Sequence, residues 1–545
     1  MERLETKKIN GHTYYYYSEW GWVNGKCRRI WQRYLGKLEN IVKACEGGGP
    51  APLYADVFQW GLPAALWKEL SSARVIEEID ALCPKRNQGL STGEYIGVAS
   101  VNRAIRPNSK RSMWSWFSQT VLLRYLPNAS KEALSSQRFW DHMDRIEGDK
   151  PAQIWRNIIK GVAEREEIDL SSVSYDGTNF YTFIDTFNVR CQIAKRGKNK
   201  QGQSNLRQVS YALFCSADGH MPLFYDVYEG NRNDAKQFPV MLEKFNTFLQ
   251  EVRGGRCGPE DTTLIFDKGN NSPTNFEMID SMGLNFVGSV KLGEHKELAQ
   301  ISNGDDRFRS CEAAGLDGTK AFRVKKTVYG KERVLVVSYN QNLFDAQWLT
   351  LQNDISKAIE RLAELQQKLR DRAAGLIQRG QVPTVASVEK QCESILSRQH
   401  LNQVITIDIR EGKEKIPELE HAVDAVALSD LADTRLGKNI IISNRELWDD
   451  SKIIEAYRSQ FIIEDVFKEM KDRTTGSWWP MHHWTDSKIA VHGLYCTIAL
   501  LLRALMLRRV RAAQMQLSMK RLLSELDYMR QVINIFPKKR RQKTE

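Results

Sequence analysis

The spacing of hydrophobic and polar residues predicts a β-hairpin followed by helices in the first part of the chain. The stretch HTYYYYSEWGWVNGKCRRIWQRYLGKL (12–38) alternates aromatic and polar residues around an Asn-Gly pair, which is a strong hairpin signal. Residues 52–165 carry apolar residues at helical spacing, most clearly over 63–82 and 91–105. The second of these stretches begins with Ser and Thr, which are suited to cap a helix.

From residue 166 the pattern changes to strands and helices in alternation. The expected order is three strands, a helix, a strand, a helix and a strand. The first and fourth strands each end on a single aspartate, Asp176 and Asp267, which is then released into a loop. The corresponding ranges are a strand from 166 to 176, two strands within 206–231, a helix at 234–252, a strand at 262–267, a helix at 272–282 and a strand at 284–292.

Residues 293–450 are predicted to form a second unit. It contains strand patterns at 332–340, 403–410 and 437–444, and a long charged helix at 351–376. After this unit, YRSQFIIEDVFKEMKD (457–472) has no Gly or Pro and is predicted to be one helix.

An apolar stretch at 489–502 is predicted to be a buried core helix rather than a membrane span. It is short for a bilayer and contains His492. The chain ends in a basic tail at 537–545, whose composition suits a localisation signal or a solvated, phosphate-contacting segment.

Composition narrows the class of protein. At 545 residues the chain is too long for one core, and its formal net charge of +12 favours a polyanionic partner, with nucleic acid as the leading candidate. The nine cysteines occur singly without a CxxC pair, which argues against a zinc ribbon or a redox motif. The odd cysteine count and the absence of a signal-peptide pattern lead us to expect a reducing cytoplasm and no membrane partner.

The predicted hairpin carries basic side chains among its aromatic ones. Arg28, Arg29 and Arg33 could grip the DNA backbone from this ribbon. An ordinary hairpin stabilised by aromatic cross-strand pairs explains the same pattern equally well.

Three residues of the 457–472 helix are spaced seven apart. Tyr457, Glu464 and Lys471 fall in one row, because seven residues complete nearly two helical turns. The plainer interpretation is a surface row of mixed charges on an amphipathic helix. The rest of the chain has to decide between this interpretation and a functional role for the row.

Asp176, Asp267 and Glu464 together suggest a metal site. Carboxylates that converge at one end of a mixed sheet can hold a pair of Mg²⁺ ions, which prefer oxygen ligands and catalyse in-line phosphoryl transfer. Each aspartate alone could equally be a turn residue or a helix cap. On composition alone, other acids compete with Asp176, namely Asp185, Asp226 and Asp234.

Several stretches of the sequence resemble bacterial insertion-sequence transposases of the DDE class, in the group with a Tyr-Arg-Glu-Lys signature. The stretches SYDGTNF and FDKGNNS are similar to the family's two aspartate blocks, and MPLFYDVYEGNRNDAKQF and YLGKL resemble further segments. The signature falls on Tyr457, Gln460, Glu464 and Lys471, so Gln460 stands where the family has Arg, and Arg458 lies two residues earlier. Gln460 can donate hydrogen bonds but adds no charge.

The resemblance implies an activity and a set of site residues. Asp176, Asp267 and Glu464 would be the catalytic metal ligands for Mg²⁺, with Mn²⁺ as a substitute. The DNA contacts would be made by Tyr457, Arg458, Gln460, Lys471 and Lys268, together with the hairpin arginines. The chain would act as a homodimer on double-stranded DNA in the bacterial nucleoid, cutting at terminal inverted repeats and joining the 3′-OH ends to target DNA. An RNase H-like nuclease without strand transfer, a domesticated DNA-binding protein and a non-enzymatic regulator stay open as alternatives.

The resemblance also implies a fold class and domain bounds. We expect an α/β protein with an RNase H-like mixed-sheet core, interrupted by a largely β insertion and preceded by a mainly helical DNA-binding region with a β-hairpin. The expected bounds are 1–165 for the DNA-binding region, 166–292 for the first part of the core, 293–450 for the insertion, 451–510 for the catalytic helix and the helix after it, and 511–545 for a helical basic tail.

Overall fold

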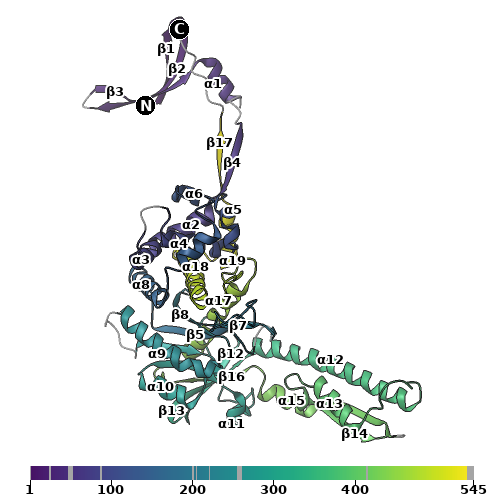
Figure 1. Cartoon of the computed structure of the whole chain (residues 1–545). Helices are drawn as coiled ribbons and strands as arrows, with labels where there is room; N and C mark the ends of the chain where they lie inside the picture. Colours follow the sequence, from purple (N-terminus) through teal and green to yellow (C-terminus); the bar gives the residue numbers. More distant parts are fainter. Residues whose placement is uncertain are drawn as a thin grey trace. The chain divides into compact units, whose positions relative to one another are not determined.

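The computed structural model describes residues 2–23, 26–46, 53–85, 89–198, 202–203, 205–219, 221–253, 261–412 and 415–536. It divides into two compact units (Figure 1). The first comprises Met1–Ala64, Phe117–Leu126 and Leu523–Glu545, and the second comprises Ala65–Trp116 and Pro127–Leu522. These limits differ from the predicted bounds, because most helices of the predicted N-terminal region belong to the compact unit that contains the large sheet.

The first unit contains a three-stranded antiparallel sheet in the order β1-β2-β3. Strand β2 (His12–Val23) pairs with β3 (Lys26–Gly36), which confirms the predicted hairpin, although its turn residues Asn24 and Gly25 lie outside the described residues. The sequence prediction missed β1 (Glu2–Ile9), which pairs along the other edge of β2. Helix α1 (Leu38–Cys45) follows the sheet.

The C-terminal segment is not wholly helical as predicted. Helix α19 (Met519–Asp527) is followed by β17 (Arg530–Ile535), which pairs antiparallel with β4 (Tyr54–Gln59). The alternation in RQVINI, with every second residue less exposed, explains why this segment is a strand. The predicted basic tail at 537–545 lies outside the described residues.

A ten-stranded mixed sheet organises the second unit. Its central strands lie in the spatial order β8-β7-β5-β9-β10. Strands β5, β9 and β10 are parallel to one another, and β7 is antiparallel to both β5 and β8. The predicted order of three strands, helix, strand, helix and strand is confirmed. These elements are β5 (Ser172–Thr182), β7 (Arg207–Ser216), β8 (Pro222–Glu229), α9 (Asp234–Arg253), β9 (Thr263–Phe266), α10 (Pro273–Ser281) and β10 (Asn285–Val290), with the two-residue β6 (Lys195–Arg196) at the edge beside β7.

One strand end was predicted wrongly. Strand β5 does not end on Asp176 but continues to Thr182, because its antiparallel partner β7 pairs with it along that whole length. The parallel partner β9 stops at Phe266. Asp176 therefore lies within a strand, next to the point where the neighbouring strand ends.

Part of the predicted insertion belongs to the same sheet. Strand β10 pairs with β16 (Lys438–Ser443), and the sheet continues through β13 (Lys331–Asn340) and β12 (Thr319–Val328) to β11 (Arg309–Ser310). Residues 293–450 are therefore not an independent unit, because their strands extend the core sheet.

The remainder of this segment is mainly helical. Its longest element is α12 (Gln341–Ala373), of 33 residues, so the predicted largely β character is not confirmed. A separate apolar cluster joins α12 to the elements that follow it (Figure 1), which are α13 (Val385–Ile395), α14 (Leu401–Val404), the hairpin of β14 (Ile405–Glu411) and β15 (Pro417–Val423), and α15 (Ala425–Thr434).

Helices cover the two faces of the central sheet, as alternation along the strands requires. On one face, Phe238 of α9 packs on Tyr175 and Phe266, and Phe276 of α10 packs on Phe266. On the other face, α16 (Asp450–Arg458) buries Ile453 and Ile454 against residues such as Ile265 and Val287.

The predicted helix at 457–472 is two helices. Helix α16 ends at Arg458, a turn occupies Ser459 and Gln460, and α17 (Phe461–Lys471) follows and packs on β5 and β7. The two helices together thus extend across the sheet from its β10 side to its β5 side.

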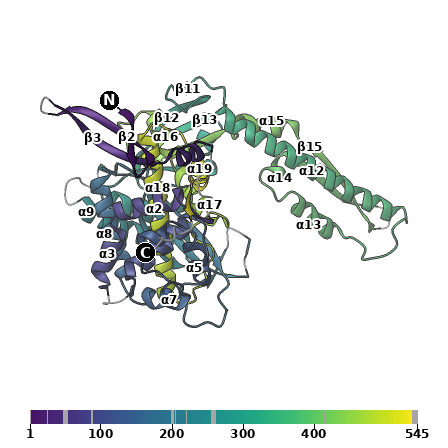
Figure 2. The same ribbon diagram turned by 90° about the horizontal axis from the view of Figure 1, so that it is seen from above.

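The predicted core helix is confirmed as α18 (Asp486–Ala512). On length and composition alone it could cross a membrane, but 94% of its most apolar window is buried within the protein. It packs against β8 and α4, and Figure 2 shows it among the helices of the second unit. Those helices are α2 (Gly61–Ser72), α3 (Val75–Leu82), α4 (Thr92–Ile105), α5 (Met113–Phe117), α7 (Ser136–Met143) and α8 (Lys150–Arg165). Helix α4 has the predicted cap at Ser91. The first turn of α2, the last residue of α5 and all of α6 (Leu122–Tyr125) belong to the first unit.

Candidate active site

Three polar side chains lie in register across neighbouring parallel strands. Tyr175 of β5 pairs with Phe266 of β9, so the next residues along, Asp176 and Asp267, lie side by side. The pairing of Val287 with Ile265 places Ser289 of β10 beside Asp267 in the same way. Adjacent strands are about 4.8 Å apart, and residues in register point to the same face. The sheet therefore places Asp176, Asp267 and Ser289 in one row.

The face of this row is the one that α16 covers. Asp267 lies two residues after Ile265 and Ser289 two residues after Val287, and both apolar residues pack in the cluster that includes Ile453 and Ile454. Asp176 and Asp267 are each partly exposed, so the row lies at the margin of this packed layer. We call it the acidic row.

Tyr457 connects the helix to one end of the acidic row. Its hydroxyl donates a hydrogen bond to the Ser289 hydroxyl at 2.9 Å, and the Ser289 hydroxyl is 3.5 Å from Oδ1 of Asp267. Burial raises the pKa of Tyr457, the charges of Asp267 and Glu464 raise it further, and the hydrogen bond to Ser289 opposes the rise. Tyr457 is therefore a neutral donor at physiological pH, within electrostatic reach of both carboxylates.

Lys471 contacts β5 just beyond the other end of the acidic row. Its ammonium donates to the hydroxyl of Thr178 at 2.5 Å, and Thr178 is two residues beyond Asp176 on the same face of β5. The ammonium also lies 5.9 Å from the centroid of the Phe180 ring. A positive charge is thus held at Thr178, two residues along β5 from Asp176.

Glu464 lies between these two contacts along the helices. It is in the first turn of α17, where a carboxylate is favourable at the helix N-terminus, and it is exposed. Tyr457 lies seven residues before it over β10, and Lys471 lies seven residues after it over β5. The two helices thus place Tyr457 at β10 and Lys471 at β5, and a row that runs through Glu464 stays a prediction.

The donor chemistry of the acidic row suits a hard divalent cation. Asp176 and Asp267 supply carboxylate oxygens from adjacent strands, and their partial exposure leaves room for water and for a substrate phosphate. Within the described residues, no group of three or more His, Cys, Asp and Glu side chains could hold a metal ion. The strands thus align two of the three predicted ligands, and a site completed by Glu464 stays a prediction.

The other predicted contacts near the catalytic helix differ in accessibility. Arg458 donates to the carbonyl of Gly315 and to the hydroxyl of Thr319, and Gln460 is only 7% exposed. Lys268, directly after Asp267, is exposed. Of these three, Lys268 is the most accessible to DNA, and burial at position 460 explains how an uncharged residue is accommodated there.

The hairpin arginines lie on the first unit. Arg28, Arg29 and Arg33 are exposed on β3, and the Arg29 guanidinium lies 5.2 Å from the ring centroid of Trp20. Trp31 also packs edge-on against Tyr17. Aromatic cross-strand packing and exposed basic groups are therefore both present, and DNA contact by the arginines stays a prediction.

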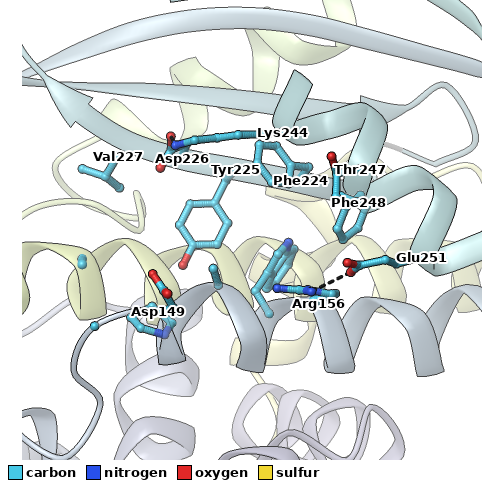
Figure 3. A pocket seen from close by; sticks show the side chains of 15 residues that line it. Asp149, Arg156, Phe224, Tyr225, Asp226, Val227, Lys244, Thr247, Phe248 and Glu251 are labelled. Carbon is cyan, nitrogen blue, oxygen red and sulfur yellow. Dashed lines mark hydrogen bonds and ion pairs between the residues drawn. The ribbon is translucent and has the colours of Figure 1, made fainter. Parts of the chain in front are cut away.

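The acids that compete with Asp176 have other surroundings. Asp226 accepts a hydrogen bond from Lys244 at 2.5 Å, beside a cavity of about 440 Å³ (Figure 3), and Asp185 accepts one from the amide of Phe187 as a turn residue. Asp234 begins α9, and its charge and that of Asp176 both add to the rise in the pKa of Tyr228 that burial causes. Register with Asp267 distinguishes Asp176 from these three.

Sequence reasoning missed two contacts of the site. Ser289 and Thr178 are uncharged, but each lies on the face of the acidic row and receives a hydrogen bond from a residue of the signature. Thr178 could have been found because it is two residues after Asp176 in a strand. Ser289 required knowledge that β10 lies next to β9.

Comparison with known proteins assigns the family. Residues 171–502, more than half of the chain, match the transposase DDE domain, and the chain belongs to this family. The piggyBac transposase synaptic complex with hairpin DNA is similar at 9% identity and a TM-score of 0.37, over 85% of this chain and 79% of that one. The Mos1 transposase paired-end complex with the left transposon end is similar at 11% identity and a TM-score of 0.15, over 37% of this chain and 59% of that one. No curated protein matches the sequence.

Proposed function

We propose that the protein is a DNA transposase that cuts phosphodiester bonds at its element's inverted-repeat ends and joins the freed 3′-OH to target DNA. The observation that carries this proposal is the alignment of Asp176 with Asp267 across β5 and β9, within a domain of the DDE transposase family. The strand order β8-β7-β5-β9-β10 supports the RNase H-like core that the sequence resemblance implies.

In this proposal the carboxylates of the acidic row would hold the divalent cations that assist cleavage. Asp176, Asp267 and Glu464 would hold Mg²⁺, and two such ions supply activation of the attacking oxygen and stabilisation of the leaving oxygen. Ser289 and Tyr457 orient the Asp267 carboxylate from one side. Lys471 supplies a positive charge at Thr178, two residues from Asp176 on β5, and is proposed to contact a phosphate oxygen from there.

The exposed arginines of β3 are proposed to bind DNA from the first unit. Their charge is consistent with an overall net charge of +12, and phosphate neutralisation supplies most non-specific DNA affinity. A homodimer that pairs two transposon ends, and residence at the bacterial nucleoid, complete the proposal.

The test is a cleavage and strand-transfer assay with DNA that carries the inverted repeats flanking the gene. With Mg²⁺ or Mn²⁺, the protein is expected to cut the ends and give joined products. Asp176→Ala, Asp267→Ala and Glu464→Ala should each abolish both products and leave DNA binding intact.

Other results would favour the alternatives. Cutting without joining would indicate a nuclease of the same fold. Binding without cutting, with all three alanine variants behaving like the parent, would indicate a regulator or a domesticated DNA-binding protein and would contradict the proposal.

A further inference from the structure

A second cavity lies beside Asp267, between the end of β10 and the beginning of α12. Its volume is about 570 Å³. Ser289 lines this cavity and also contacts Asp267, so the cavity and the acidic row share a wall. Other walls come from α12, from the residues before α14 and from the segment that leads into β16. We call it the exit pocket.

The charged residues that line the exit pocket are mainly basic. It includes Lys268, Lys291, Arg435 and Lys438, and Asp354 is the one acidic residue among those that line it. The Asp354 carboxylate already accepts from Arg398 at 2.7 Å. An anionic ligand would therefore meet an excess of positive charge.

The four basic residues do not have the same role. The Lys438 ammonium is buried and donates to the backbone carbonyls of Ala299 and Thr434, so it holds the start of β16 in place. Lys291 is 64% exposed, and its ion pair among the described residues is an i,i+3 pair with Glu294 at 3.4 Å, which is weak at a surface. Lys268 is exposed and Arg435 partly so. Three cations are thus placed to receive a ligand.

His400, in the wall of the exit pocket, has an unusual backbone conformation. Its φ of 71° lies in the left-handed region, which costs a non-glycine residue free energy. Such strain is concentrated at ligand sites, because the surrounding structure has to maintain it. The conformation turns the chain directly before α14, where His400 lines the exit pocket.

We propose that the exit pocket binds a phosphodiester of the DNA strand that continues beyond the phosphate held at Asp176 and Asp267. This inference rests on the proposed function. Successive phosphates of one strand are about 3.4 Å apart along the duplex axis, so a strand bound at the acidic row brings its next phosphates to the wall shared through Ser289. Arg435 can bind phosphate through two parallel hydrogen bonds, and Lys268 and Lys291 act as point charges.

The first test is lysine labelling of the full-length protein by an amine-specific acylating reagent, read by mass spectrometry. The probe is a mixed-sequence duplex with a short single-stranded extension, with Ca²⁺ in place of Mg²⁺ as the oxygen-coordinated cation so that the acidic row can take a phosphate while cleavage is suppressed. Lys291 and Lys268 should lose severalfold reactivity when the DNA binds. Lys357, an exposed lysine of α12 outside the exit pocket, is the matched control and should stay unchanged.

Two results of the labelling would overturn the inference. One is unchanged reactivity of Lys291 at saturating DNA. The other is equal protection by millimolar inorganic phosphate without DNA, since the exit pocket would then be a site for a small anion. Because labelling requires no catalysis, an inactive protein would contradict the proposed function without deciding this experiment.

The second test measures affinity for the same probe as salt is raised. Lys291→Ala and Arg435→Ala should each weaken binding several-fold and reduce the slope of log K against log salt by about 0.7 to 0.9, as one lost phosphate contact predicts. Arg435→Lys should restore part of the affinity, which separates lost charge from misfolding. Lys357→Ala is the control, and the same slope for it and for the two pocket variants would contradict the inference.

Discussion

The two sheets of this protein carry charge in different ways. In the large sheet, the carboxylates of Asp176 and Asp267 are fixed by strand register and contacted through Ser289 and Thr178 by the helices above. In the three-stranded sheet, Arg28, Arg29 and Arg33 project from an exposed strand. Chemistry requires groups held in fixed positions, whereas non-specific backbone binding requires only accessible charge. We therefore expect substitutions in the large sheet to affect catalysis and those in the small sheet to affect affinity.

The largest expected effect is on the acidic row. Asp176→Asn or Asp267→Asn should reduce DNA cleavage by about 10³-fold or more, because a lost metal ligand removes several kcal/mol of transition-state stabilisation. Cleavage of inverted-repeat DNA measures the effect, and binding should be unchanged in a mobility-shift assay. Asp226→Asn is the matched control, because that acid pairs with Lys244 away from the row. An equal loss of cleavage in all three variants would contradict a specific catalytic role for the acidic row.

The next effect concerns the positive charge of Lys471, held at Thr178 on β5. Lys471→Ala should slow cleavage by about 10- to 100-fold, which corresponds to the loss of one charge-assisted hydrogen bond to phosphate. Lys468→Ala removes an exposed lysine of the same helix that pairs with Asp465 at 2.9 Å, and its rate should stay near the parent's. Similar rates for the two variants would mean that the position of the charge is unimportant.

Substitutions in the three-stranded sheet should weaken DNA binding and leave the cleavage rate unchanged. A variant with Arg28, Arg29 and Arg33 all changed to Ala should bind DNA about tenfold more weakly, and its salt slope should be shallower by about 2 to 3. At saturating DNA its cleavage rate should equal that of the parent. Fluorescence anisotropy across a salt series, followed by single-turnover cleavage, tests both statements. An unchanged salt slope would remove the DNA-binding interpretation of β3.

The smallest effect concerns two buried histidines, His483 in the segment before α18 and His492 within α18. Burial lowers the pKa of His483 and of His492 well below its usual value, and nearby Arg103 and Lys110 lower both further. Both histidines are therefore neutral in the folded state but protonate in the unfolded chain below about pH 6.5. The free energy of unfolding should fall with decreasing pH below that value, by up to about 1.4 kcal/mol per pH unit for each histidine.

Denaturant unfolding at pH values between about 5 and 7 measures how the free energy of unfolding changes with pH. This range spans the usual histidine pKa of about 6.5. His483→Gln should make this pH slope shallower, whereas His482→Gln, at an exposed neighbouring position, should leave it unchanged. A slope that is equally steep in the parent and in both variants would show that other groups cause the acid sensitivity.

The sequence predicted the elements of the large sheet better than their neighbours in space. Hydrophobic alternation placed the central strands and α9 and α10 correctly, because each of these elements has one buried face. It ended β5 too early, since the antiparallel partner that extends the strand cannot be read from β5 itself. It also separated residues 293–450 from the core, because long-range pairing of β10 with β16 has no local signal.

For the candidate site, the structure gives the positions of the predicted residues, and their roles stay predictions. The positions of Asp176 and Asp267 followed from strand patterns and family resemblance, and the seven-residue row located Tyr457 and Lys471. The turn at Ser459 and Gln460 was missed, because neither residue is a helix breaker and the turn depends on packing across the sheet. The contacts to Ser289 and Thr178 required the three-dimensional structure.

The most direct test of the central claim is Mn²⁺ binding to the full-length protein in the presence of DNA, measured by electron paramagnetic resonance. If Asp176 and Asp267 form one site, Asp176→Asn and Asp267→Asn should each abolish the bound-Mn²⁺ signal, and Asp226→Asn should retain it. Undiminished Mn²⁺ binding in either of the first two variants would contradict the account.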